Sequence, residues 1–110
     1  MLVHPSRGLG DAVPTVIKEA MALGTPVITA ARALSGLAHI LPGHHLLVAE
    51  SDAEMAEAAL LVLREPVVAA TLAANARQVI ERRYTWTALA RSYTLLWTRA
   101  AHAVPAAVAA

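Results

Sequence analysis

The hydrophobic pattern at the start of the chain predicts a strand, a helix and a second strand. Residues 1–4 (MLVH) and residues 26–30 (PVITA) are apolar runs of strand length. Between them, residues 15–23 carry apolar side chains at helical spacing, with Pro14 expected at the first helical position and Gly24 at the stop. The residues predicted to form the buried face of this helix are Val13, Val16, Ile17, Ala20 and Met21. A strand–helix–strand order of this kind predicts that the two strands are parallel.

The rest of the pattern predicts a third strand and three further helices. Residues 31–43 are expected to form a loop with one helical turn, and residues 45–49 (HLLVA) a short strand. Ser51 opens a capping-box motif (S-x-x-E) before one helix, Pro66 begins the next, and a fourth helix starts near Thr85. The residues expected to face inward are Met55, Ala58, Ala59, Val62, Leu63, Leu72, Ala76, Val79 and Ile80, followed by Trp86, Leu89, Ala90, Tyr93, Leu96 and Trp97.

These elements predict an α/β fold with a partial Rossmann-like parallel sheet of about three short strands, flanking helices and a C-terminal helical segment. Parallel sheets are normally wider than this and covered on both faces. We therefore expect residues 1–102 to be the C-terminal part of a larger α/β domain. The alanine-rich residues 103–110 are expected to form a flexible tail.

The composition changes this interpretation in one respect. The chain is 57% hydrophobic and 15% charged, whereas soluble domains average about 45–50% and about 25%. We therefore expect either that another domain or subunit covers its surface, or that the chain is a piece of a larger protein.

The net charge of +1 gives no strong electrostatic field that would attract nucleic acid or lipid. The absence of cysteine, of a signal-peptide pattern and of a transmembrane run makes a cytoplasmic location the expectation.

The histidines and the paired arginines are further candidates for a functional site. His44 and His45 are adjacent on a predicted strand, so their side chains should point to opposite faces. Because zinc needs three or four ligands, no metal site is predicted. His4 is expected to be a hydrogen-bonded structural histidine. Arg82 and Arg83 are interpreted as a pair at a helix end, where cations complement the dipole, rather than as a nucleic-acid patch.

Two acidic residues flank the start of the first helix: Asp11 in the preceding glycine-bearing loop and Glu19 within the helix. The unpaired N–H groups at a helix start favour an anion such as a phosphate. Asp11 would repel a phosphate but suits sugar hydroxyls, and Glu19 could accept from the hydroxyls of a ribose. The alternative is that the acids only complement the helix dipole. The spacing alone favours this simpler interpretation and leaves both open.

The residues around this acid pair resemble a known family. The donor-site signature of GT-B glycosyltransferases, especially family 4, consists of an acid, seven residues, Glu-Ala, then Gly and Pro-Val. It is similar to residues 5–30 of this chain, PSRGLGDAVPTVIKEAMALGTPVITA. SGL at 35–37 resembles the glycine loop of these enzymes. PGHHLLVAESDAEMAEA resembles their following strand and helix, and RYTWTALARSY the aromatic–Ser/Thr–Trp start of their last helix. The resemblance covers roughly residues 3–98.

The resemblance implies roles for these residues in a retaining transfer of sugar from a nucleotide-diphosphate sugar, without bound metal or cofactor. Asp11 would contact the donor sugar and Glu19 the ribose, which makes them the candidate catalytic residues. The other expected donor-binding residues are Arg7, through its side chain, and Ala12, Val13, Thr15 and Val16, through their backbone N–H groups. Asp11 replaces the Glu that is usual in the family, and Ala38-His39 stands where an acid is often found.

The resemblance also implies that part of the machinery is missing. The Arg/Lys pair that neutralises the diphosphate, and the acceptor domain, lie upstream of Met1 in these enzymes. The isolated chain is therefore expected to be inactive, with the missing N-terminal domain as its partner and part of the last helix facing it. The parent enzyme could act at the inner face of a membrane, and the exposed apolar surface could also self-associate. The alternatives are another GT-B enzyme, such as a nucleotide-sugar epimerase, or a non-catalytic interaction module.

Overall fold

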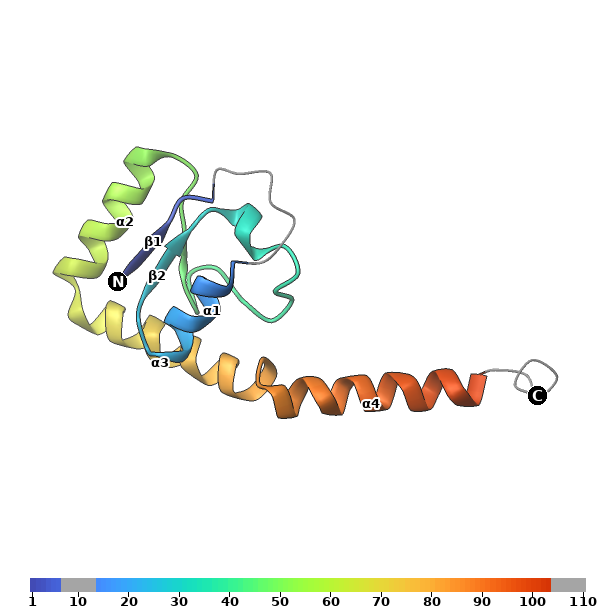
Figure 1. Ribbon diagram of the computed structural model, residues 1–110. Coiled ribbons are helices and arrows are strands. Elements are labelled where there is room, and N and C mark those ends of the chain that lie inside the picture. The colour runs from blue at the N-terminus through green and yellow to red at the C-terminus, as the bar shows by residue number, and fades with distance from the viewer. Residues whose placement is uncertain (7–13, 104–110) are drawn as a thin grey trace.

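A computed structural model describes residues 1–6 and 14–103 of the chain. Three short strands form one parallel sheet in the order β1-β2-β3, and helices pack against it (Figure 1). The elements are β1 (Leu2–His4), α1 (Thr15–Ala22), β2 (Val27–Thr29), the 3₁₀ turn η1 (Ala31–Leu34), β3 (Leu47–Val48), α2 (Asp52–Arg64), α3 (Pro66–Arg83) and α4 (Trp86–Ala103). The predicted α/β class, with its partial Rossmann-like sheet, is confirmed.

Both ends of α1 can be explained from the sequence. Pro14 has φ −60° and ψ 118° and is the N-cap, so the prediction that it is the first helical residue was wrong by one position. Its carbonyl already accepts from the Ile17 N–H at 3.1 Å, as an N-cap carbonyl should. At the other end, Gly24 has φ +71° and its N–H donates to the Met21 carbonyl, while the Thr25 N–H donates to the Ala20 carbonyl. This pair of bonds is a Schellman motif, as the predicted glycine stop requires.

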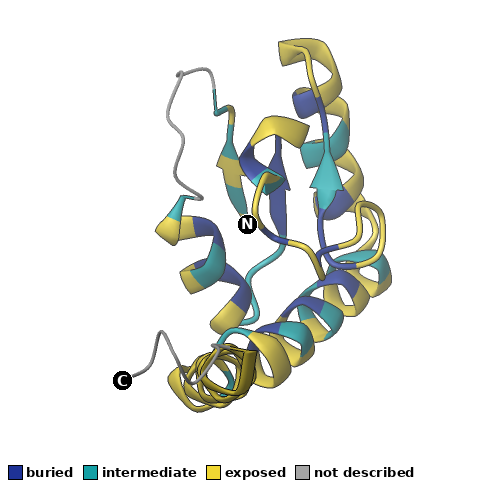
Figure 2. Ribbon diagram, turned by 90° about the vertical axis from the view of Figure 1, so that its right-hand side faces the viewer, coloured by how far each residue is buried: buried dark blue, intermediate teal, exposed yellow. Residues whose placement is uncertain are grey.

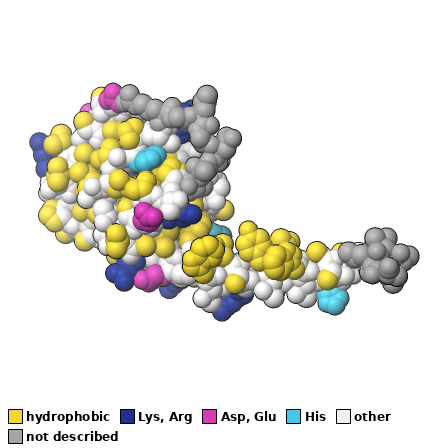
Figure 3. Space-filling view, viewed as in Figure 1, with side chains coloured by type: hydrophobic (Ala, Val, Ile, Leu, Met, Phe, Trp, Pro, Cys, Tyr) yellow, Lys and Arg dark blue, Asp and Glu magenta, His cyan; other side chains and the backbone are white. Residues whose placement is uncertain are grey.

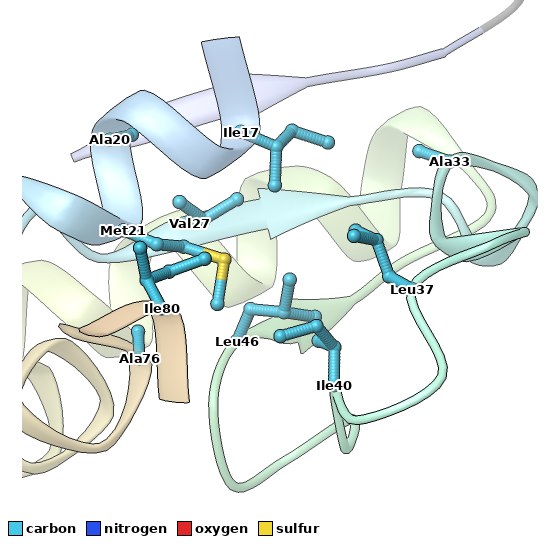
Figure 4. Close-up of a cluster of buried hydrophobic side chains, with 10 residues drawn as sticks. All are labelled: Ile17, Ala20, Met21, Val27, Ala33, Leu37, Ile40, Leu46, Ala76 and Ile80. Atoms are coloured by element: carbon cyan, nitrogen blue, oxygen red, sulfur yellow. The ribbon is translucent and has the colours of Figure 1, made fainter. Parts of the chain in front are cut away.

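The sheet separates two hydrophobic cores, because successive side chains of β2 point to opposite faces. Val27 contributes to a core with α1 and the second half of α3 (Figure 4), whereas Ile28 contributes to a core with α2. The first core consists of Ile17, Ala20, Met21, Val27, Ala33, Leu37, Ile40, Leu46, Ala76 and Ile80, and the second of Ile28, Ala30, Ala49, Met55 and Val62.

Most of the predicted inward positions are confirmed, with two exceptions on α1 and α2. Val16 is 40% exposed and Leu63 is 68% exposed. Val16 comes one position before the core residue Ile17, and Leu63 comes one position after the core residue Val62. One position corresponds to about 100° of rotation around the helix, which turns both side chains away from the core. On α2 the predicted cap is present, since Ser51 Oγ accepts from the Glu54 N–H at 3.1 Å. The Glu54 carboxylate accepts from the Glu50 N–H at 2.8 Å instead of completing the usual capping box.

The last helix differs most from the sequence-based expectation. α4 extends away from the α/β body (Figure 1), and none of its residues is buried (Figure 2). The radius of gyration is accordingly 17.9 Å, compared with about 13 Å for a compact chain of this length. The helix itself and its apolar stripe were predicted, but the stripe is not buried by any of the described residues. Ala103, which was assigned to the tail, is the last residue of α4. The rest of the predicted tail lies outside the described residues.

The stripe of α4 is nevertheless strongly apolar. Hydrophobic side chains gather along one side of the projecting helix (Figure 3). Trp86 is 88% exposed and Trp97 is 67% exposed, and the Trp97 ring lies 5.8 Å from that of Tyr93. Large exposed apolar patches of this kind are typical of interaction surfaces. The prediction that these aromatic residues pack within the chain was therefore wrong.

Candidate functional site

The carboxyl edge of the sheet defines the candidate site. His4 ends β1 and is paired in register with Thr29, which ends β2. Thr29 is fully buried, and its hydroxyl donates to the His4 carbonyl at 2.9 Å. This bond joins the end of β1 to the end of β2. In parallel α/β sheets ligands bind at this edge.

Two local features distinguish the chain that leaves β1. Ser6 has φ +50°, a left-handed conformation that is uncommon for residues other than glycine. Such a conformation costs on the order of 1 kcal/mol and often occurs at functional sites. The His4 side chain has a buried Nδ1 with no hydrogen-bond partner among the described residues. The expectation that His4 is hydrogen-bonded is therefore not met at Nδ1, and this unsatisfied polar atom belongs to a residue two positions before Ser6.

The start of α1 offers backbone donors towards this edge. Pro14 supplies no side-chain cap. The N–H groups of Thr15 and Val16 belong to the first turn and have no carbonyl partner within the helix. Together with the helix dipole they favour an anion in front of the helix. These are the N–H groups that the predicted donor roles of Thr15 and Val16 would use.

Glu19 lies on the same side of α1 as these donors. It follows Thr15 by four positions and Val16 by three, so all three share one face of the helix. All three are exposed, while Ile17 and Met21 on the opposite face are completely buried. No described residue forms an ion pair with Glu19. Its carboxylate is therefore available to hydroxyl donors one turn beyond the helix start.

Four further residues were predicted to belong to the site. Arg7, Asp11, Ala12 and Val13 lie outside the described residues. The predicted acid pair is thus described only at Glu19, and the separation of its two carboxylates stays a prediction.

The paired histidines adopt a different geometry from the one expected. His44 and His45 lie in a turn before β3 rather than on a strand, and their rings meet edge to face with centroids 4.7 Å apart. The argument that they point to opposite faces was therefore wrong. The turn arises because Gly43, at φ +78°, reverses the chain and its N–H donates to the Leu46 carbonyl at 2.7 Å. Over residues 1–6 and 14–103, no group of three or more His, Asp or Glu side chains could hold a metal ion.

One residue at the carboxyl edge was not anticipated. The Glu50 carboxylate accepts from the Ala31 N–H at 2.8 Å, directly beyond the end of β2. Glu50 follows β3 by two residues, so this bond joins the segments that leave two neighbouring strands. An acid at that position after a strand is a signal that sequence reasoning could have used. The hydrogen bond from the Ala31 N–H to the Glu50 carboxylate fixes the start of η1 at the rim of the candidate site.

The comparison with protein families shows which family the chain resembles over most of its length. A family model described as glycosyl transferase-like matches residues 1–94. The chain belongs to this family. The match spans the sheet, α1, α2, α3 and the first half of α4, so the predicted GT-B glycosyltransferase-like identity is confirmed. No curated protein and no solved structure shows significant similarity to this glycosyl transferase-like chain.

None of the helices in the described part of this glycosyl transferase-like chain has the length and apolar character needed to cross a membrane.

Proposed function

We propose that this glycosyl transferase-like chain forms the donor-binding wall of a retaining GT-B glycosyltransferase, which transfers sugar from a nucleotide-diphosphate sugar to an acceptor. The observation that carries the proposal is the exposed face of α1, where the Thr15 and Val16 amides and the Glu19 carboxylate lie together at the carboxyl edge of a parallel sheet. Amides at a helix start suit a diphosphate, and an unpaired carboxylate suits vicinal hydroxyls.

The chemistry that follows is positioning and charge stabilisation. The helix start would hold the diphosphate and stabilise the charge that develops on it as the bond to the sugar breaks. Glu19 would accept from the two ribose hydroxyls, and Asp11 from hydroxyls of the donor sugar. Arg7 and the Ala12 and Val13 amides would complete the anion site. We propose that this wall needs no metal or cofactor.

The other wall of the cleft is proposed to be an N-terminal domain of the same protein, without which the chain is inactive. The exposed stripe of α4 supports such a partner, because an apolar surface that includes Trp86 and Trp97 requires a cover. A GT-B enzyme of this kind would work in the cytoplasm, including at the inner face of a membrane. The same stripe favours one alternative of another class, in which the chain is a non-catalytic module that docks a partner or associates with itself. A nucleotide-sugar epimerase is the alternative with the same fold.

The ribose role of Glu19 can be tested by a double cycle. The chain is titrated with nucleoside diphosphates and with their 2′,3′-dideoxy counterparts, for the wild type and for Glu19→Gln. We expect weak saturable binding by the wild type that falls roughly tenfold without the ribose hydroxyls, since hydrogen bonds to a charged group contribute about 1.5–3 kcal/mol. The Glu19→Gln variant should bind both ligands as weakly as the wild type binds the dideoxy compound, and should no longer distinguish the nucleoside diphosphate from its dideoxy counterpart.

Glu57→Gln is the matched control, because Glu57 is an exposed acid on α2 and its loss removes the same charge. This variant should keep the wild-type preference for the ribose. If Glu19→Gln discriminates between the ligands as strongly as the wild type, or if no nucleoside diphosphate binds, the proposed donor site is wrong.

A further inference from the structure

A basic pocket lies away from the start of α1, between the end of α3 and the loop that precedes β3. It has a volume of about 250 Å³. This is below the roughly 300–1,000 Å³ of pockets that take drug-sized ligands, so it suits a small ion better than a complete nucleotide sugar. The residues that line it are His39, His45, Gln78, Val79, Arg82 and Arg83. Apart from Val79, each of these side chains can donate a hydrogen bond, and no carboxylate is among them.

Burial and hydrogen bonds hold His45 in place on one side of the pocket. His45 is only 8% exposed, and its Nδ1 accepts from the Leu41 N–H at 2.9 Å. Because Nδ1 is an acceptor, the proton of the neutral ring is on Nε2, which is left as a donor. Burial, and secondarily the neighbouring His44, lower the pKa of His45 and favour this neutral form. The turn bond from the Gly43 N–H to the Leu46 carbonyl holds the backbone in place.

The arginines on the opposite wall lack acidic partners. Neither Arg82 nor Arg83 forms an ion pair with any described residue. The nearest acid on α3, Glu81, pairs with Arg77 at 2.9 Å. At 100° of rotation per residue, Glu81 lies about 100° and Arg77 about 140° around α3 from Arg82. Two adjacent guanidinium groups therefore line the pocket with no carboxylate to neutralise their charge, because Glu81 pairs with Arg77.

The rim is fixed by an aromatic contact. The His39 N–H donates to the Tyr84 hydroxyl at 3.3 Å, and the two rings meet edge to face with centroids 6.4 Å apart. Tyr84 directly follows α3, so this contact ties the loop that carries His39 to the helix end that carries the arginines. The two walls of the pocket are thereby held at a defined separation.

We propose that this pocket binds a phosphate-type anion, held by the Arg82 and Arg83 guanidinium groups and the His45 Nε2–H. Guanidinium groups match phosphate oxygens in paired, charge-assisted hydrogen bonds. The bound group is a free phosphate or diphosphate, or the phosphomonoester headgroup of a lipid, since all present the same oxygens. The site is distinct from the proposed donor site on α1 and would bind without it.

The test is a titration of the ¹⁵N-labelled chain with inorganic phosphate and diphosphate at constant ionic strength, followed by amide chemical shifts. We expect saturable shifts in the loop around His39 and in the last turn of α3. The double variant Arg82→Gln/Arg83→Gln should weaken this binding by roughly tenfold or more. Shifts of the Thr15 and Val16 amides report the proposed donor site separately and should be unaffected by the variant.

The matched control is Arg91→Gln/Arg99→Gln, which removes the same charge from the exposed helix α4. It should bind as the wild type does. Shifts that do not saturate, or an equal loss in both double variants, would overturn the proposal. His45→Phe, which keeps a ring but removes the donor, should also weaken binding, and wild-type affinity in this variant would contradict the assigned role. Vesicles that contain phosphatidic acid distinguish the two possible origins of the bound phosphate group. If the vesicles compete with free phosphate for the pocket, the ligand is a lipid headgroup; if they do not compete, it is a soluble anion.

Discussion

Gly24 provides the clearest quantitative prediction, because its conformation is the only obstacle to a side chain. It has φ +71°, and a Cβ added there would meet no atom within 4 Å. Gly24→Ala is therefore free of steric clash and carries only the left-handed backbone penalty of about 1–2 kcal/mol. The smaller conformational freedom of alanine in the unfolded chain offsets roughly 0.4–1 kcal/mol of this.

We therefore expect Gly24→Ala to lower the free energy of unfolding by about 1 kcal/mol, which corresponds to a fall in Tm of about 5 °C for a domain of this size. Urea titration and thermal denaturation followed by circular dichroism measure both quantities. Gly24→Asn should lose less, because asparagine tolerates the left-handed region. Gly43→Ala is the matched case, with φ +78° and equally open space, and should lose a similar amount. An unchanged or raised Tm for Gly24→Ala would refute the Schellman end of α1.

Three further outcomes are expected. Ser51→Ala removes the oxygen that accepts from the Glu54 N–H and should cost about 1 kcal/mol of stability in urea titration; no loss would contradict the cap. Met21→Ala truncates a completely buried side chain in the α1 core and should cost about 2–5 kcal/mol, whereas a change below 1 kcal/mol would contradict the packing. For His45, whose pKa is lowered from 6.5 on folding, the unfolded chain binds the proton more readily, so stability should fall as pH is lowered through and below 6.5. His45→Gln should flatten this pH dependence, and an unaltered pH profile would exclude His45 as its source.

The local parts of the fold were predictable because they depend on spacing and backbone chemistry. The order of strands and helices followed from hydrophobic periodicity, and the end of α1 from Gly24. The inward positions on α3, such as Leu72, Ala76 and Ile80, followed from the 3.6-residue period and are all buried. In each case the information lies within a few neighbouring residues.

The features that depend on distant contacts could not be predicted in the same way. Periodicity identified the apolar stripe of α4 but not what covers it, and within the described residues nothing does. The apolar pattern after His45 predicted a strand that includes this residue, whereas Gly43 places it in a turn. The unsatisfied nitrogen of His4 depends on which groups the fold brings near it. Of the candidate site, the position of Glu19 within α1 was predicted from the sequence, whereas the contribution of Glu50 was not.

The most direct measurement of the central claim is an amide chemical-shift map of the ¹⁵N-labelled chain during titration with a nucleoside diphosphate. The account predicts saturable shifts at Thr15, Val16 and Glu19, on the exposed face of α1 and away from its buried face. Shifts confined to the basic pocket at the end of α3, with α1 unchanged, would contradict the assignment of α1 as the donor-binding helix.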